Sequence, residues 1–402
     1  MDTNELRNGY KRAFPNGGEP RFFYAPGRVN LIGEHIDYNG GYVFPCALTL
    51  GTYAAIAKRD DNIMRLFSAN IKPLITVSTD NLEYNPEHRW ANNPKAVTKL
   101  LMDMGHTLGG FDLYVWGNLP SNAGLSSSAS INVLVAFALN TIYETGLDPI
   151  EIALLCQRAE NEYLGVNCGI MDQFASAMGK KNHAILLNCN TLKYQYVPLE
   201  LGDYRLILAN TNKPRALIDS KYNERRAECE YALEILKKAT DIQNLCEIDF
   251  EKFTEHSKKA FGEDTIKEGM TSASLSAEAI AFNRACHAIS ENDRVKTAVQ
   301  ALSKGDISTF GKLMTASHNS LRDFYEVTGA ELDALVQAAS DFKEMIGSRM
   351  TGAGFGGCTV SIVHKDKIED FIKKVGQQYT KSSGLVADFY VAEVDDGARE
   401  IY

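Results

Sequence analysis

Leu119-Pro-Ser-Asn-Ala-Gly-Leu-Ser-Ser-Ser-Ala-Ser130 lies between a predicted strand, Phe111–Trp116, and an apolar segment predicted to run as a helix to about Tyr143. Gly124 permits a tight turn, and the small residues around it let a ligand approach the backbone. The serine hydroxyls stand beside the unpaired N–H groups of the helix start, which suits a polyanion such as a nucleotide phosphate. The alternative is a serine cap on an ordinary buried helix, but three consecutive serines plus Ser130 exceed what capping needs.

Two familiar nucleotide-binding loops do not occur in this chain. It has no G-x-x-x-x-G-K-[ST] motif, and the serine-rich segment does not have the glycine spacing of a dinucleotide-binding fingerprint. If the protein uses ATP, it therefore does so through another fold.

The order of predicted elements indicates an α+β protein of two domains. A chain of 402 residues is long enough for two domains, and its strands cluster at the front and back instead of alternating regularly with helices. We place the boundary near residue 205, giving domains of residues 1–205 and 206–402. Strands are predicted at Tyr42–Leu48, Tyr53–Lys58, Ile63–Ser68, Ile75–Ser78, 183–189, 204–210 and Asp388–Val394, and helices from Pro94, at 149–164, at 170–179 and through most of 216–345.

Composition excludes several classes of protein. With 45% hydrophobic and 23% charged residues, the chain is neither disordered nor fibrous. A net charge of −9 without a long basic run argues against nucleic acid, and no apolar stretch indicates export or a membrane span. The eight cysteines form no C-x-x-C pair, so we expect reduced thiols, no structural zinc and a cytoplasmic location. The oligomeric state stays open, with a monomer favoured.

A second glycine-bearing segment, Ala25–Tyr42, concentrates Arg28, Glu34, His35 and Asp37 within ten residues. A solvated turn is the simple interpretation. The apolar residues between these polar groups should nevertheless draw them toward the interior, where charged groups usually have a ligand or a partner. Carboxylates with His and Tyr are suitable donors and acceptors for a polyhydroxylated molecule such as a sugar.

Two further segments are ambiguous alone. The segment Arg349-Met-Thr-Gly-Ala-Gly-Phe-Gly-Gly-Cys-Thr-Val-Ser361 is either a glycine turn between strands or a second wall of a phosphate or substrate pocket. Asp172 near a helix start is more often an acid at the helix dipole than a catalyst. Glu160, on a preceding helix, is either a salt-bridge partner or a metal ligand.

Together these segments resemble the small-molecule kinases that include galactokinase, homoserine kinase, mevalonate kinase and phosphomevalonate kinase. PSNAGLSSSAS resembles the phosphate loop of this GHMP family, and RMTGAGFGG resembles its third motif. GRVNLIGEHIDYNGG, GVNCGIMDQF, DSKYNERRAECE and SLRDFYEVTGAEL resemble the galactokinase branch. Six segments agree in order, from about residue 10 to the C-terminus.

The resemblance implies a mixed-sheet N-terminal domain with helices, a ferredoxin-like α+β C-terminal domain, and an active site between them. It implies transfer of the ATP γ-phosphoryl group to the anomeric hydroxyl of α-D-galactose, with Mg²⁺ as cofactor. The expected partners are the small-molecule substrates galactose and ATP, and neither nucleic acid nor a membrane is expected. The implied residues are Asp172 as base and Arg28 beside it; Glu34, His35, Ile36, Asp37, Gly169 and Tyr222 at the sugar; Ser68, Gly124, Leu125, Ser126, Ser127, Ser128, Ala129 and Ser130 at ATP; and Ser130 and Glu160 at the metal.

This chain departs from the family pattern at two positions. Ile36 stands where many galactokinases have Thr, so one polar contact to the sugar is missing. Asn132 stands where the family commonly has Glu, which changes the charge near the metal.

Two other functions share most of these residues. A kinase of N-acetylgalactosamine or arabinose would handle phosphate identically, although the resemblance places Glu34 at a 6-hydroxyl that arabinose lacks. A galactose and ATP sensor without catalysis is the other alternative. The complete Gly-Leu-Ser-Ser-Ser-Ala-Ser segment argues against the sensor.

Overall fold

A computed structural model describes residues 2–120, 123–214, 218–271 and 274–402, so Ser121 and Asn122 of the predicted phosphate loop lie outside the described residues. The first half of the chain and the last strand, β13, together build a six-stranded sheet in the order β13-β1-β3-β6-β4-β5. The sheet is mixed, as expected, because β4 and β6 run parallel while the other neighbours are antiparallel. Its strands are β1 (Arg21–Asn30), β3 (Pro45–Lys58), β4 (Ile63–Ser68), β5 (Ile75–Ser78), β6 (Phe111–Gly117) and β13 (Arg399–Ile401).

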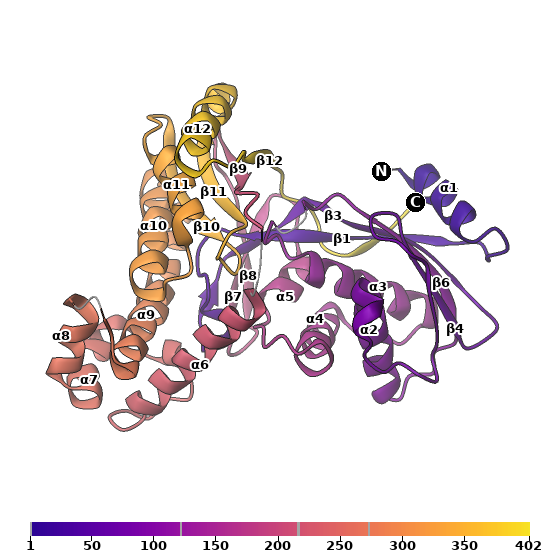
Figure 1. Cartoon of the computed structure of the whole chain (residues 1–402), viewed down its shortest axis with the longest axis horizontal. Coiled ribbons are helices and arrows are strands. Elements are labelled where there is room, and N and C mark those ends of the chain that lie inside the picture. Colours follow the sequence, from indigo (N-terminus) through magenta and orange to yellow (C-terminus); the bar gives the residue numbers. More distant parts are fainter. Residues whose placement is uncertain (1, 121–122, 215–217, 272–273) are drawn as a thin grey trace.

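Helices cover both faces of this sheet. On one face, α1 (Thr3–Ala13) buries Leu6, Tyr10 and Phe14 against the strands. The other face is covered by the helices that carry the candidate site, as Figure 1 shows beneath the sheet. These helices are α2 (Asn92–Asp103), α3 (Ser127–Tyr143), α4 (Pro149–Arg158) and α5 (Met171–Met178).

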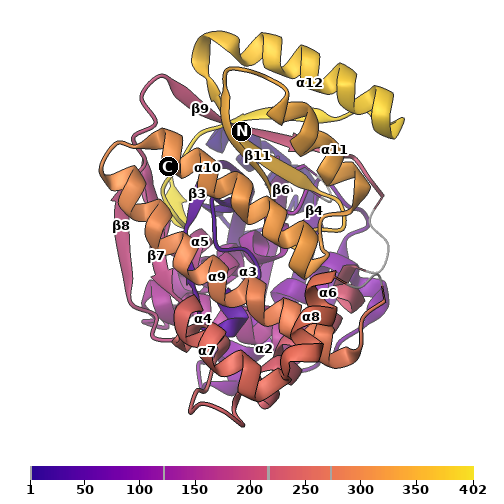
Figure 2. The same cartoon turned by 90° about the vertical axis from the view of Figure 1, so that its left-hand side faces the viewer.

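A second, antiparallel sheet lies in the other half of the molecule, in the order β10-β11-β9-β12. Two helices pack on one of its faces through a separate hydrophobic cluster (Figure 2). This is the α+β arrangement expected of the C-terminal half. Its elements are β9 (Tyr204–Asn210), β10 (Met345–Thr351), β11 (Cys358–His364), β12 (Asp388–Ala392), α11 (Gly329–Ser340) and α12 (Ile368–Ser383).

The segment between β9 and β10 is helical, as the sequence predicts. Two elements within the helical regions are π-helices, at Ala159–Leu164 directly after α4 and at Leu321–Tyr325 directly after α10. A small sheet of β2 (Tyr42–Val43), β7 (His183–Asn188) and β8 (Tyr194–Pro198) completes the fold. The remaining helices are α6 (Ile218–Leu236), α7 (Phe250–Phe261), α8 (Glu263–Thr271), α9 (Ala277–Ser303) and α10 (Ile307–Ser320).

Residues 25–42 are not a solvated turn, because the segment begins inside β1, where nine of ten residues are buried. The register shifts between Pro26 and Arg28, so a bulge accommodates the proline, which cannot donate to the ladder. The interpretation of this segment as drawn toward the interior is therefore confirmed.

The two strands predicted at 42–48 and 53–58 are wrong as separate elements, since most of this region is the single strand β3. From the sequence alone, Gly51 near the centre of β3 indicates the end of one strand and the start of another. A side chain there would collide with the Ala25 carbonyl of β1, so this glycine allows two strands to approach closely. Within the described part of the chain, no helix combines the length and apolar character that a membrane span needs.

Candidate active site

Arg28 and Asp172 form the centre of the site. Arg28, on β1, donates from Nε and Nη2 to the two carboxylate oxygens of Asp172, each at 2.7 Å. Its third nitrogen, Nη1, donates to the Gly124 carbonyl at 2.7 Å. Asp172 lies in the first turn of α5, and its carboxylate also accepts a 2.5 Å bond from the Ser126 hydroxyl. The guanidinium therefore joins the serine-rich loop to the carboxylate.

The serine-rich loop packs directly on β1. The Arg28 N–H donates to the Leu125 carbonyl at 3.2 Å, and a Cβ on Gly27 would lie 2.5 Å from the same oxygen. Ser126 adopts a left-handed conformation, with φ of 62°, and α3 begins at the next residue. Helix α3 therefore starts with its free N–H groups beside Asp172, as an anion-binding loop requires.

Two serines of this loop point in different directions. The Ser128 hydroxyl donates to Glu160 Oε1 at 2.9 Å, and Asn132 Nδ2 donates to the same oxygen at 3.2 Å. Ser130, with 0% exposure, instead donates to the Ala25 carbonyl and contacts the Thr52 hydroxyl at 2.8 Å. The structure thus brings Glu160 together with Ser128 and leaves Ser130 behind the helix.

Glu160 lies in the first π-helix, Ala159–Leu164, and lines the same pocket as Asp172. Burial raises its pKa to about 7, and the charge of Asp172 adds to this effect. A nearby cation would restore its charged form. Within the described residues, no group of three or more His, Cys, Asp or Glu side chains is arranged to hold a metal ion.

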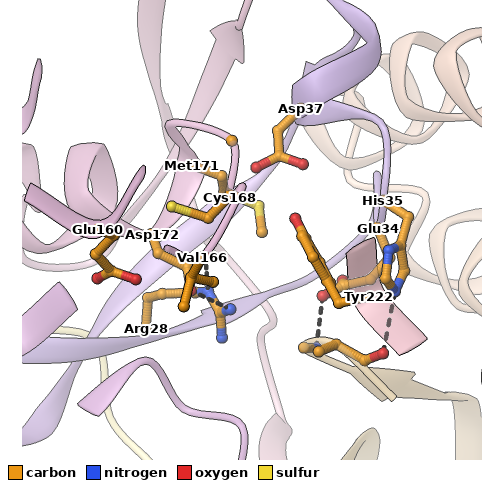
Figure 3. A pocket seen from close by; sticks show the side chains of 13 residues that line it. Arg28, Glu34, His35, Asp37, Glu160, Val166, Cys168, Met171, Asp172 and Tyr222 are labelled. Atoms are coloured by element: carbon orange, nitrogen blue, oxygen red, sulfur yellow. Dashed lines mark hydrogen bonds and ion pairs between the residues drawn. The ribbon is translucent and has the colours of Figure 1, made fainter. Parts of the chain in front are cut away.

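Among the residues predicted to contact a sugar, Glu34, His35 and Tyr222 lie at the other end of the pocket, whereas Asp37 lies apart from them (Figure 3). Figure 3 shows Arg28, Asp172 and Glu160 at one end, with Glu34 and His35 at the opposite end. Tyr222, from α6, lies near His35, with ring centroids 5.5 Å apart. The structure therefore brings together residues predicted from four separate segments.

His35 is held as a neutral ring. Its Nδ1 lies 2.9 Å from the Tyr38 hydroxyl and its Nε2 lies 3.2 Å from the Ala353 carbonyl. Because the carbonyl accepts, Nε2 carries the proton, and Nδ1 accepts from Tyr38. Burial lowers the pKa of His35 to about 3, so the ring offers no positive charge to a substrate.

Asp37 faces the pocket beside Gly169. A Cβ at position 169 would overlap the Asp37 carboxylate, so only glycine leaves room for that side chain. Burial raises the pKa of Asp37 to about 7, and the negative charge of Asp172 contributes. Asp37 is therefore an acceptor that needs donors, as a sugar hydroxyl would supply.

Ile36, by contrast, is fully buried in the hydrophobic core and is not among the pocket-lining residues. It separates Asp37 from His35 without presenting a side chain to the cavity.

A second hollow adjoins the serine loop. It is lined by Ser127, Ser128 and Ser68, together with apolar and amide side chains such as Trp90 and Asn93. The Ser68 hydroxyl accepts from the N–H groups of Asn70 and Ile71, both at 3.2 Å. Ser128, which lines this hollow, donates to Glu160, which lines the first pocket. Among the loop residues predicted at ATP, the side chains of Leu125 and Ala129 are buried instead.

Several residues around the pocket have no role in the sequence analysis. Arg349, on β10, and Asn30, at the end of β1, both bond to the Glu34 carboxylate. The Tyr38 hydroxyl lies 2.7 Å from that of Tyr325, which the second π-helix carries. Arg349 begins the third glycine-rich segment, and that position was the available signal. Gly352 of the same segment approaches the Gly124 carbonyl, so the two glycine-rich loops do share a wall.

A serine loop at a helix start, facing an Arg–Asp pair between two α+β halves, defines the chain as a small-molecule kinase of the GHMP class. Family models agree: GHMP kinases N terminal domain matches residues 92–180, and GHMP kinases C terminal matches residues 298–381. The galactokinase galactose-binding signature matches residues 8–58. The chain belongs to the galactokinase family.

Relatives cover the whole chain. A galactokinase of Fusobacterium nucleatum is 51% identical over 98% of this chain and 99% of its own length. A galactokinase of Clostridium tetani is 48% identical over 100% of this chain and 98% of its own. The crystal structure of Lactococcus lactis galactokinase complexed with galactose is similar with a TM-score of 0.93, at 42% identity and 99% coverage of both chains.

More distant structures share the fold alone. Methanococcus jannaschii mevalonate kinase matches with a TM-score of 0.64 at 18% identity, covering 95% of this chain and 100% of its own.

Proposed function

We propose that this protein transfers the γ-phosphoryl group of ATP to the anomeric hydroxyl of α-D-galactose, giving α-D-galactose 1-phosphate and ADP. The observation that carries the proposal is the Arg28–Asp172–Ser126 cluster, which stands where the sugar-side pocket meets the serine loop. The galactokinases at about half identity over their whole length support galactose as the substrate.

Asp172 is the proposed general base. Its carboxylate accepts the proton of the anomeric hydroxyl as the new O–P bond forms, and the bond from the γ-phosphorus to the ADP oxygen breaks. Arg28 holds both carboxylate oxygens and, being cationic, offsets negative charge on the phosphoryl group in transit. Positioning and charge neutralisation are the main requirements of this reaction.

Five residues are proposed to hold the sugar. Glu34 and Asp37 offer acceptors, the Tyr222 hydroxyl offers a donor, the neutral His35 ring lines the pocket, and Gly169 gives Asp37 its space. A hydroxyl of the wrong configuration would leave one of these buried groups without a partner, which costs about 1–3 kcal/mol. Asp37 and Tyr222 are our candidates for distinguishing an axial from an equatorial hydroxyl.

The protein side of the site fits Mg²⁺ bound mainly through substrate phosphates. Mg²⁺ usually keeps several waters and takes one or two protein carboxylates plus phosphate oxygens. Glu160 supplies a carboxylate whose pKa is raised by burial, so that a bound cation would favour its charged form, and Ser128 supplies a hydroxyl at 2.9 Å from it. We therefore propose Glu160 and Ser128, in place of Ser130, as the ligands. When bound, the ion would neutralise phosphate charge.

The nucleotide is proposed to lie in the hollow beside Ser68, with its phosphates at the loop from Gly124 to Ser130. Backbone N–H groups of this loop and the start of α3 suit phosphate oxygens, while the apolar and amide side chains suit a base.

The proposal also covers the domain organisation and the cellular location of the protein. The division into domains 1–205 and 206–402 is supported by the separate sheets on either side of the link from β8 to β9, with the exception of β13, which returns from the second segment to the first sheet. A cytoplasmic location is supported by the eight cysteines, none of which forms a disulfide in the described part of the chain.

The test measures ADP release from MgATP with galactose, glucose, N-acetylgalactosamine and arabinose, for the wild type and Asp172→Asn. We expect turnover on galactose that falls by at least about 100-fold in the variant, while galactose binding by calorimetry persists. Binding of galactose and ATP without turnover in the wild type would replace the kinase by a sensor. Preferred turnover of N-acetylgalactosamine would redefine the substrate.

A further inference from the structure

The Glu34 carboxylate accepts hydrogen bonds from residues of the other half of the molecule. Its Oε2 accepts from Arg349 Nη2 and from Asn30 Nδ2, each at 2.8 Å, and its Oε1 accepts from the Gly352 N–H at 2.5 Å. Arg349 is 315 residues away in sequence and has 0% exposure. A sugar-facing carboxylate of the first half therefore takes its orientation largely from β10 and the loop after it.

Arg349 holds the backbone as well as the carboxylate. Its Nη1 donates to the Asn30 carbonyl at 2.7 Å while its Nη2 reaches Glu34. The planar guanidinium thus spans the end of β1 and the turn that carries Glu34. Lysine has one flexible ammonium in place of this fixed fork and cannot hold both acceptors in the same geometry.

One hydrogen-bond acceptor position of the Glu34 carboxylate has no partner among the described residues. An ionised carboxylate has about four acceptor positions on its two oxygens. The described residues occupy three of them, through Arg349, Asn30 and Gly352. Glu34 also lines the sugar pocket, so the remaining position is available to a ligand hydroxyl.

We propose that Arg349 is a positioning residue that sets the sugar specificity of this site, by fixing Glu34 so that its one open acceptor position meets the 6-hydroxyl of galactose. The inference rests on the proposed function, since it names how that substrate is chosen. Loss of the guanidinium frees the Glu34 carboxylate to turn away, and the preference for sugars that carry the 6-hydroxyl should fall.

The experiment compares galactose with 6-deoxygalactose in the wild type, Glu34→Gln, Arg349→Gln and Arg349→Lys. A hydrogen bond to a charged acceptor corresponds to discrimination of roughly 10- to 100-fold in kcat/KM. In Arg349→Gln we expect this discrimination to collapse to within about 3-fold, through a raised KM for galactose and a nearly unchanged kcat/KM for 6-deoxygalactose. Arg349→Lys should retain the positive charge and still lose most of the discrimination.

Arg284→Gln is the matched control, because Arg284, like Arg349, is a buried arginine that holds a carboxylate. Its carboxylate partners are Glu228 and Glu326. It should lower the thermal midpoint like Arg349→Gln while leaving the sugar discrimination unchanged. In the double variant Glu34→Gln/Arg349→Gln, the second substitution should add no further loss of discrimination, as coupled residues require.

Two results would overturn the inference: equal loss of activity on both sugars in Arg349→Gln, or equal loss of discrimination in Arg284→Gln. Failure of the proposed function gives a different result, namely a wild type that phosphorylates neither sugar. If the Arg349→Gln chain does not fold, the same comparison is made with Arg349→Lys. Unchanged discrimination between galactose and 6-deoxygalactose in that variant would contradict the role of the Arg349 guanidinium.

Discussion

At the scale of single residues, four carboxylates line one pocket, those of Glu34, Asp37, Glu160 and Asp172, and their partners differ. Asp172 has Arg28 and Glu34 has Arg349, whereas Asp37 has no cation among its hydrogen-bond partners in the described residues. Burial accordingly raises the pKa of Asp37 to about 7. The ligand-free protein therefore contains a group whose charged form is disfavoured by folding.

The variant Asp37→Asn should be more stable than the wild type above neutral pH. A carboxyl with a folded-state pKa of about 7 and an unfolded value near 3.9 stabilises the fold below pH 4 and loses that contribution as pH rises through 7. At pH 8 the difference in free energy of unfolding should be about 2–4 kcal/mol. Urea unfolding of both proteins at pH 5 and pH 8, without sugar or metal, measures it.

Glu160 stays in both proteins and titrates in the same range, so the variant keeps a smaller dependence on pH. If the free energy of unfolding changed equally with pH in the two proteins, that result would contradict a raised pKa at Asp37. The variant should also bind galactose more weakly, which shows that the carboxylate is retained for function at the expense of stability.

The residues of the site differ in how far the sequence predicts them. Arg28, Glu34, His35, Asp37, Gly169 and Asp172 all line one pocket, and the resemblance to a known family had grouped them. Arg349 had no assigned role, because a bond between residues 315 positions apart leaves no local pattern. The sequence analysis placed Ser130, and not Ser128, at the metal, because the sequence alone does not show which serine of the first turn of α3 faces Glu160.

At the scale of elements, the first turn of α3 has two faces. Ser128 faces Glu160, and Ser130 faces β1 and β3 through Ala25 and Thr52. Two residues along a helix correspond to about 200° of rotation, so one serine that faces the pocket places the other behind it.

Ser128→Ala and Ser130→Ala should therefore fail in different ways. Ser128→Ala should raise the Mg²⁺ concentration needed for half-maximal activity by about 10-fold and leave the thermal midpoint nearly unchanged. Ser130→Ala should lower the free energy of unfolding by about 1–2 kcal/mol and leave the Mg²⁺ requirement unchanged. Mg²⁺ titrations of activity and thermal melts of both variants check this, and the reverse pattern would restore Ser130 as the ligand.

Strands were predicted best where a short β-like run is bounded by turn residues. The strands β4, β5 and β9 begin and end where the sequence indicated. Strand β1 was missed, because burial on both faces removes the alternation of polar and apolar residues and a bulge admits Pro26. The π-helices were also missed. They carry Glu160 and Tyr325, and such insertions often occur at functional sites.

At the scale of the whole molecule, the chain returns to its starting sheet. After β12 of the second sheet, β13 pairs with β1, and Arg21 donates two bonds of 2.7 Å to Glu400. The Ala398 N–H also donates to the Ser176 carbonyl of α5, at 2.9 Å. The last residues thus fasten both the strand that carries Arg28 and the helix that carries Asp172.

Deletion of residues 399–402 should lower the free energy of unfolding by about 1–3 kcal/mol, because it removes the β13 ladder and the Arg21–Glu400 pair. Thermal melts followed by circular dichroism measure the shift. Deletion of Tyr402 alone, which is 95% exposed, is the control and should change little. Equal midpoints for the full chain and the longer deletion would show that β13 does not support the sheet.

The predicted domain boundary near residue 205 falls between β8 and β9 and stays a prediction. The sequence did not predict β13, because three residues far from their partner strand carry too little pattern to identify them.

The grip of Arg349 and Gly352 on Glu34 has a kinetic consequence for the sugar. The carboxylate already stands in its bonded position before any ligand arrives. Sugar binding therefore needs no rearrangement of the Glu34 carboxylate, and sugars of similar size should associate at similar rates. Selection among them should appear in how long each one stays, as a difference in dissociation rate.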